Sequence, residues 1–310
     1  MALNVVVLVG GVGGAKLAYG LAQVLPAEEL SIIVNTGDDF WLYGLRICPD
    51  LDTITYTLSG LVDKTNGWGL TGDSRHMLEA LKRFGEEPWF GLGDQDVATH
   101  LLRTAALRDG ENLTNITGRL TKKLGIPQRI LPMTDDPVAT IVDTVEYGEI
   151  DFQTYFVRYR WQPTVKSLRL AGIESATISQ SVREALEKAD VILIGPSNPW
   201  LSIDPILAVP GMRELITSRP IPRVAVSPIV GGRALKGPAD KLMGELGYEP
   251  SAETVVGYYG DLINGFVYDQ TDAGLEIPLS HTLSCETIMK FDEDKIILAE
   301  NVIDWIKSWI

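Results

Sequence analysis

The sequence has few cysteines, few histidines and a shortage of basic residues. Its 310 residues include two cysteines, Cys48 and Cys285, which are too few for a disulfide framework, so we expect a reducing, cytoplasmic setting. Lysine and arginine number 27 against 41 aspartate and glutamate, and the net charge of −14 argues against a general affinity for nucleic acid or acidic membranes. No apolar run is long enough to cross a bilayer, and no signal peptide is recognisable after the first methionine. These absences exclude nucleic acid and membrane as expected partners.

The most informative stretch that is present lies in the first twenty residues. Residues 4–9 (NVVVLV) form an apolar, β-branched run, which is typical of a strand buried on both faces of a parallel sheet. Four glycines follow within five positions, and the apolar periodicity after them predicts a helix that ends at Pro26. Without Cβ atoms, backbone amides can approach a ligand at the positive end of that helix, as in phosphate-binding turns. The candidate phosphate contacts are Gly10, Gly11, Gly13, Gly14 and Lys16.

This glycine turn matches neither of the two common nucleotide motifs. A dinucleotide fingerprint needs a third glycine where Lys16 stands, and an acidic residue after the second strand, where Asn35 and Thr36 stand. A P-loop needs glycine before the lysine and serine or threonine after it, but Ala15 and Leu17 occupy these positions. The turn therefore predicts an anion site without identifying the anion, and a tight turn with no ligand is the alternative.

Carboxylates are concentrated after the second predicted strand, residues 30–36. Asp38 and Asp39 follow it directly, and Asp50 and Asp52 precede an apolar-periodic helix. Asp50 taken alone could be a helix cap. Four carboxylates beside a turn that favours an anion would repel a phosphate, unless a divalent cation lies between them. Because oxygen-only ligands suit Mg²⁺, we expect a magnesium cofactor here.

Further predicted strands at residues 128–133, 191–194 and 223–226 also end in polar loops. In a doubly wound sheet these loops open on one edge, where ligands of open α/β sheets bind. We therefore predict an α/β fold: a Rossmann-like, doubly wound and mostly parallel sheet with a helical insertion and a small β excursion. Residues 1–136 and 179–310 form the predicted core, in which 63–125 is the helical insertion, and 137–178 form an antiparallel excursion.

Six motifs in this order resemble the 2-phospho-L-lactate transferase family: VGGVGGAK, NTGDDFWLYGLRICPDLDT, WFGLGDQDVATHLLR, LPMTDDPVATIV, ILIGPSNPWLSIDPIL and VAVSPIVGGRALKGPADKLM. The resemblance implies a role in coenzyme F420 biosynthesis. It implies transfer of a 2-phospholactyl or phosphoenolpyruvyl group from a guanosine diphosphate-linked donor to the ribityl hydroxyl of the deazaflavin FO. GMP would be released with the help of Mg²⁺, and the protein would commonly be a homodimer.

The resemblance also implies roles for single residues. Asp52 and Gly91 match deazaflavin-contacting positions, although relatives tend to carry a basic residue where Gly91 stands. Arg103 and Arg108 follow on a predicted helix and could approach the donor. His100, on the same helix, is either a satisfied core residue or a donor in the site.

The resulting site combines all of these residues. The expected catalytic residues are Asp38, Asp39 and Asp52, and the expected metal ligands are Asp38, Asp50 and Asp52. The expected substrate-binding residues are Gly10, Gly11, Gly13, Gly14, Lys16, Thr36, Gly91, Asp94, Gly195, Ser197, Asn198 and Ser227. The division of metal binding and hydroxyl orientation among the aspartates stays open, as does the choice between the two donors.

Two other functions compete with the transferase. A non-catalytic regulator of the gluconeogenesis-factor type would bind nucleotide sugars and shares the glycine turn. The PDLDT and LGD motifs favour the transferase, because a regulator has no evident need for carboxylates crowded near a phosphate. A nicotinamide-dependent dehydrogenase is disfavoured by the missing fingerprint residues.

Overall fold

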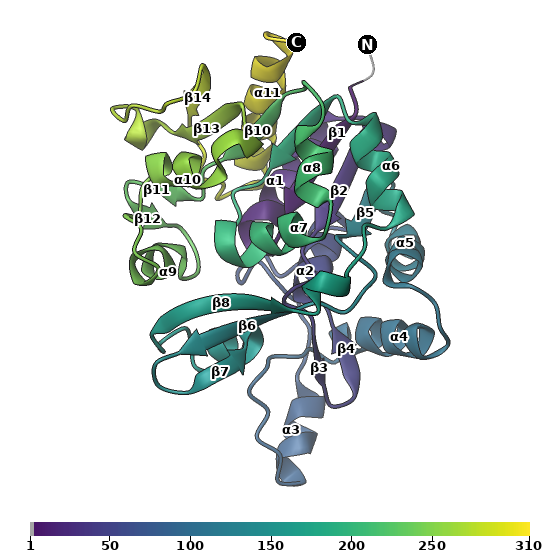
Figure 1. Ribbon diagram of the computed structural model, residues 1–310. Coiled ribbons are helices and arrows are strands. Elements are labelled where there is room, and N and C mark those ends of the chain that lie inside the picture. Colours follow the sequence, from purple (N-terminus) through teal and green to yellow (C-terminus); the bar gives the residue numbers. More distant parts are fainter. Residues whose placement is uncertain (1–2) are drawn as a thin grey trace.

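The computed structural model describes residues 3–310 and is built around one seven-stranded sheet (Figure 1). All six pairings in this sheet are parallel, in the order β14-β13-β10-β9-β1-β2-β5. The strands are β1 (Val5–Val9), β2 (Leu30–Val34), β5 (Arg129–Pro132), β9 (Val191–Ile194), β10 (Arg223–Val226), β13 (Gly265–Asp269) and β14 (His281–Cys285). The predicted α/β fold is confirmed.

The central strand β1 is buried on both faces, as its unbroken apolar run predicts. Val6 and Leu8 pack into one core, together with helices α6 (Gln180–Lys188), α7 (Asp204–Ala208), α8 (Met212–Thr217) and α10 (Ala252–Tyr259). Val5, Val7 and Val9 pack into the other, with α1 (Gly11–Val24), α2 (Pro49–Leu58) and α11 (Asp292–Lys307). Alternating side chains of one strand thus anchor both helical layers.

The strand order reverses between β1 and β9. From β1 the chain adds β2 and β5 on one side, and from β9 it adds β10, β13 and β14 on the other. Loops at the carboxyl ends of strands on either side of such a switch point diverge and leave a crevice, which is the usual ligand site of open α/β sheets. Here the switch point lies between the glycine turn after β1 and residues 195–198 after β9.

The region between β2 and β5 is mostly helical, as predicted, with α3 (His76–Arg83), α4 (Asp96–Arg108) and α5 (Leu113–Lys123). It also contains a hairpin that the sequence did not predict, β3 (Phe40–Leu42) paired with β4 (Leu45–Ile47). Two residues, Tyr43 and Gly44, connect the strands, and both have positive φ. Such two-residue turns commonly use this backbone geometry.

The excursion after β5 forms a second sheet, β7-β6-β8, from β6 (Ala139–Thr144), β7 (Gly148–Asp151) and β8 (Val165–Ala171). It lies below the carboxyl edge of the main sheet in the view of Figure 1. A short helical segment, Thr154–Arg158, follows β7 within this excursion.

Small elements complete the chain: β11 (Ile229–Val230), β12 (Arg233–Ala234) and α9 (Ala239–Glu245), with short helical turns at Ala27–Glu29, Ile173–Ser175, Pro199–Ile203, Gly260–Leu262 and Gln270–Asp272. Within residues 3–310, no helix combines the length and apolar character needed to cross a bilayer.

Candidate active site

The glycine turn is tightly packed against the loop that follows β9. The Ser197 hydroxyl donates to Gly10 O (2.8 Å) and accepts from Gly10 N (3.1 Å). A methyl group on Gly13 would lie 2.3 Å from Pro196 O, and one on Gly14 would lie 2.6 Å from Ser197 Oγ. These glycines therefore allow two loops to touch at the switch point. The expected open glycine loop is in fact the first turn of α1, which begins at Gly11.

Asp50 lies directly against this helix end. Its Oδ1 accepts from Gly11 N (2.8 Å) and its Oδ2 from Asn35 Nδ2 (3.0 Å). Burial raises the pKa of Asp50 to about 6, against the stabilising effect of these two hydrogen bonds on the charged form. Asp50 does not cap its own helix, because it lies inside α2 and the N-cap residue of that helix is Cys48. Asp50 instead contributes a negative group to the N-terminus of α1, where the helix dipole favours one.

Asp38 and Asp39 reach the same edge from the loop after β2. Burial and the nearby charge of Asp50 hold the pKa of Asp38 well above its ordinary value, and Thr140 Oγ1 lies 3.5 Å from Asp38 Oδ1. Burial raises the pKa of Asp39 to about 7, although Arg46, 3.4 Å away, favours the charged form. Asp39 Oδ1 is buried with no hydrogen-bond partner, and so is the hydroxyl of Thr36. Buried polar atoms are normally satisfied, so these two oxygens mark places for a ligand.

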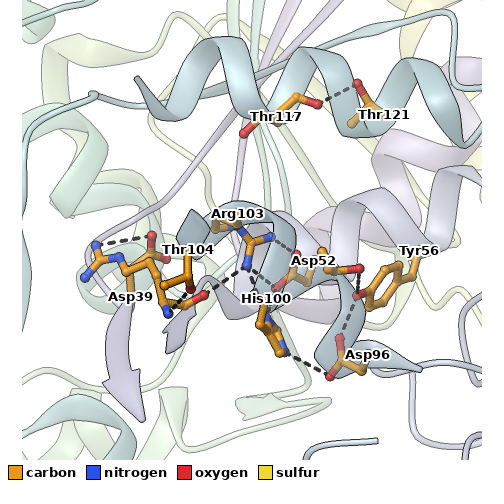
Figure 2. A network of polar contacts seen from close by, with 11 residues as sticks. Asp39, Asp52, Tyr56, Asp96, His100, Arg103, Thr104, Thr117 and Thr121 are labelled. Atoms are coloured by element: carbon orange, nitrogen blue, oxygen red, sulfur yellow. Dashed lines mark hydrogen bonds and ion pairs between the residues drawn. The ribbon is translucent and has the colours of Figure 1, made fainter. Parts of the chain in front are cut away.

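Asp52 lies in a polar network that Arg46 connects to Asp39, since Arg46 pairs with Asp39 and its carbonyl oxygen accepts from Arg103 (Figure 2). Its carboxylate forms a two-point ion pair with Arg103, in which Nη1 lies 3.1 Å from Oδ2 and Nη2 contacts Oδ1. The metal ligand set Asp38, Asp50 and Asp52 stays a prediction, but the structure turns Asp52 away from Asp50. The reason is helical geometry, because positions two apart on α2 project about 200° from each other. Asp50 faces α1, whereas Asp52 faces α4.

The cluster around Asp52 continues along α4. His100 Nε2 lies 3.3 Å from Asp96 Oδ2, and Asp96 Oδ1 accepts from the hydroxyl of Tyr56 (2.6 Å). Burial opposes the charge of Asp96, but the contact with His100 outweighs it and lowers the pKa of Asp96. Within residues 3–310, Asp52, Asp96 and His100 are the group of three whose ligand atoms come close enough for a metal ion. The guanidinium of Arg103 already neutralises Asp52, which disfavours a cation at that position. His100 is thus a core residue with polar partners.

Several expected substrate contacts have structural roles. Asp94 accepts from the Ser74 hydroxyl (2.6 Å) and from the amides of His76 (3.0 Å) and Met77 (2.9 Å), so it caps α3. The hydrogen bond from Ser74 contributes most to lowering the pKa of Asp94 to about 2. Asn198 Oδ1 likewise accepts from the amides of Trp200 and Leu201 at the start of the following helical turn.

Other residues that we expected to bind substrate form hydrogen bonds or packing contacts with other parts of the protein. Lys16 Nζ donates to Met289 O, and Ser227 donates to Ile229 O (2.8 Å). Gly195 packs on β1, because a methyl group there would lie 2.9 Å from Val9 Cγ1. A methyl group on Gly91 would lie 3.4 Å from both Trp68 and Arg75, so those two side chains flank this glycine.

Sequence reasoning did not select Arg46, Tyr56, Asp96, Thr140 or Lys236 for the site. Arg46 and Thr140 lie inside the quoted motifs NTGDDFWLYGLRICPDLDT and LPMTDDPVATIV, but no residue pattern marked either of them as a site residue. Lys236 donates to Asn66 O (3.0 Å), and after burial its charge contributes most to lowering the pKa of Lys16. The two ammonium groups therefore lie near each other beside the first turns of α1. The spacing of Asp96 and His100 on one predicted helix face was the single usable signal.

A cavity of about 170 Å³ reaches the Asp52 cluster from the side of α2, α4 and α5. Leucine and threonine side chains form most of its wall, including Leu51, Thr55 and Leu120. Asp52 and Arg103 form a charged pair in that wall. A mostly apolar wall with a few polar groups is typical of small-molecule sites, but this cavity is smaller than such sites usually are.

Comparisons with known proteins agree with this architecture. A 2-phospho-L-lactate transferase of Methanosarcina mazei is 42% identical over 302 residues, covering 96% of this chain and 99% of the relative. A phosphoenolpyruvate transferase of Streptomyces coelicolor is 44% identical over 276 residues, covering 87% and 86%. A solved UPF0052 family protein from Bacillus halodurans has the same fold, with a TM-score of 0.64 at 16% identity over 98% of this chain and 99% of that one.

The fold and the six ordered motifs agree with the family to which these relatives belong. The family model of "2-phospho-L-lactate transferase CofD" matches residues 5–303, nearly the whole chain. The chain therefore belongs to the CofD family of 2-phospho-L-lactate transferases.

Proposed function

We propose that this protein transfers a 2-phospholactyl or phosphoenolpyruvyl group from a guanosine diphosphate-linked donor to the ribityl hydroxyl of the deazaflavin FO. In the reaction the acceptor oxygen forms a bond to phosphorus, the P–O bond to GMP breaks, and GMP leaves with the bonding electrons. The proton of the hydroxyl passes to a carboxylate of the site. The product belongs to coenzyme F420 biosynthesis, and the resemblance adds a homodimer to the same proposal.

The observation that carries the proposal is the group of buried aspartates at the switch point. Asp38 and Asp50 are both buried, and their mutual repulsion contributes to the raised pKa of Asp38. A divalent cation would relieve that repulsion, so the donor set fits Mg²⁺, which binds proteins through one or two carboxylates plus phosphate oxygens and water. Asp38 and Asp50 would hold the ion, and it would neutralise charge on the diphosphate as the bond to GMP breaks.

The chain's own groups would hold the donor and orient the acceptor. The first turn of α1 would direct its backbone N–H groups and the positive end of its dipole at the diphosphate, except for Gly11 N–H, which already donates to Asp50. Lys16 and Lys236 stand beside that turn and add positive charge. Asp39 has a free buried oxygen and a pKa of about 7, which suits a general base that accepts the proton of the hydroxyl near neutral pH.

The test incubates the protein with FO and each of the two donors, with Mg²⁺ or with a chelator, and identifies the products by mass spectrometry. We expect a deazaflavin adduct and GMP with one donor, and loss of both in chelator. Asp38→Asn should lower turnover by about 100-fold or more, because it removes a charge from the cation site. Asp109→Asn is the matched control, since Asp109 is exposed at the end of α4.

Two outcomes would contradict parts of this proposal. Transfer that continues undiminished in chelator would remove the role of the metal. Tight binding of guanosine nucleotides without an adduct from either donor would favour the non-catalytic regulator.

A further inference from the structure

The ion pair of Asp52 and Arg103 is buried between two helices that are distant in sequence. Asp52 lies in α2 and Arg103 in α4, and their side chains are 8% and 4% exposed. The guanidinium contacts both carboxylate oxygens, which fixes the plane of the carboxylate as well as its position. A single lysine-type contact would fix neither.

A second set of contacts holds Arg103 in turn. Its Nη1 donates to Arg46 O (3.3 Å) and lies 3.2 Å from His100 Nδ1. Because a guanidinium has donors only, this contact assigns the acceptor role to Nδ1 and the proton to Nε2, which faces Asp96. The network thus links two helices through polar contacts on facing sides (Figure 2).

This arrangement contributes less to stability than its number of contacts suggests. Removing two charges from water costs several kcal/mol per ion, and apolar residues of similar volume often replace buried ion pairs without loss. The pair also borders the apolar cavity between α2, α4 and α5, so one side of it faces space that a ligand could fill. Burial opposes the charge of Arg103, but the Asp52 carboxylate beside it holds the pKa of Arg103 above its ordinary value.

We propose that Arg103 is a positioning residue, which holds the Asp52 carboxylate in one orientation for contact with the deazaflavin acceptor. The inference rests on the proposed function, because it requires FO as the acceptor, and it takes Asp52 as the acceptor contact that the PDLDT motif implies. In this proposal Arg103 does not contact the donor. His100, Asp96 and Tyr56 support the guanidinium and act through it.

A double-mutant cycle tests this inference with Asp52→Asn, Arg103→Met and the two combined. Arg103→Met should raise the KM for the acceptor by about 10-fold or more, while the donor KM changes by less than about twofold. In the Asp52→Asn background the same substitution should have almost no further effect on the acceptor KM. Arg103→Lys keeps the charge but loses the two-point contact, so its effect should be intermediate.

The control is Arg119→Met on the neighbouring helix α5, since Arg119 is exposed and pairs with Glu111. Thermal unfolding of every variant checks folding, and Arg103→Lys replaces Arg103→Met where the latter does not fold. Equal effects of Arg103→Met with and without Asp52→Asn would overturn the inference, as would a lower Tm with unchanged KM values. A wild-type protein that transfers nothing from either donor would overturn the proposed function, and the inference with it.

Discussion

At the scale of single residues, the site is defined by carboxylates that the fold buries without enough positive charge around them. Asp38, Asp39 and Asp50 all have raised pKa values, and burial is the largest cause in each case. Asp52 differs because Arg103 balances it. Residues of one type within one short stretch of sequence therefore have different chemistry, and the difference depends on which charged group faces each one.

The raised pKa of Asp39 predicts how stability changes with pH. A carboxyl whose pKa rises from 3.8 to about 7 on folding costs nothing at low pH, where both states are protonated. Above both values the folded state must carry a buried charge, and the free energy of unfolding is lower by about 4 kcal/mol. The loss develops as the pH rises between these two pKa values.

Asp39→Asn should remove this penalty. We compare the free energy of unfolding of the variant with that of wild type in the presence of chelator. The variant's advantage should increase by about 3 kcal/mol from pH 5 to pH 8. Urea unfolding at the two pH values measures the difference. The exposed Asp109→Asn should show no such change, and an unchanged difference for Asp39→Asn would mean that Asp39 is not protonated in the folded protein at pH 5.

At the scale of secondary-structure elements, the close approach of α1 to the loop after β9 determines how the chain packs at the switch point. Gly13 lies in the first turn of α1 against Pro196, with no room for a methyl group. Gly244 also lies inside a helix, α9, but nothing is within 4 Å of where its methyl group would be. Alanine substitutions at these two glycines therefore separate the effect of packing on stability from the effect of helix propensity.

Gly13→Ala should destabilise the protein by about 2 kcal/mol or more, because the new methyl group overlaps a carbonyl oxygen and moves α1 away from the β9 loop. It should also weaken donor binding, since the same turn would hold the diphosphate. Gly244→Ala should stabilise the protein by about 0.5 to 1 kcal/mol through helix propensity. Urea unfolding and donor titration give both values. A neutral Gly13→Ala would show that α1 and the β9 loop can separate without cost.

At the scale of the whole molecule, the proposed function would bring an acidic protein together with an anionic donor. With a net charge of −14 and aspartates in the site itself, the protein would repel a diphosphate that arrives without a cation. Binding of Mg²⁺ and of the nucleotide should therefore be coupled, and the coupling must be reciprocal.

We expect Mg²⁺ to tighten GDP binding by about 5- to 150-fold, and GDP to tighten Mg²⁺ binding by the same factor. Calorimetric titration of GDP with Mg²⁺ and with chelator measures the first factor. Asp50→Asn should abolish the coupling, whereas Asp109→Asn should preserve it. Equal affinity for GDP in the two buffers would contradict the placement of the ion between the aspartates and the diphosphate.

The sequence by itself determined the sheet and the edge at which ligands are expected. β-Branched runs report burial locally, and a polar loop after each run marks the carboxyl end of a strand, so β1, β2, β5, β9 and β10 could all be predicted. The unpredicted hairpin at residues 40–47 is the exception, because its strands are too short and too exposed to show a clear alternation.

Only the tertiary structure decided which groups each aspartate contacts. Asp50 meets the N-terminus of α1 and Asp52 meets Arg103, 51 residues further along, because the helix turns them to opposite sides. Asp94 became a helix cap because Ser74 and the start of α3 lie against it. Partners of this kind depend on how distant segments pack, and neither composition nor spacing carries that information.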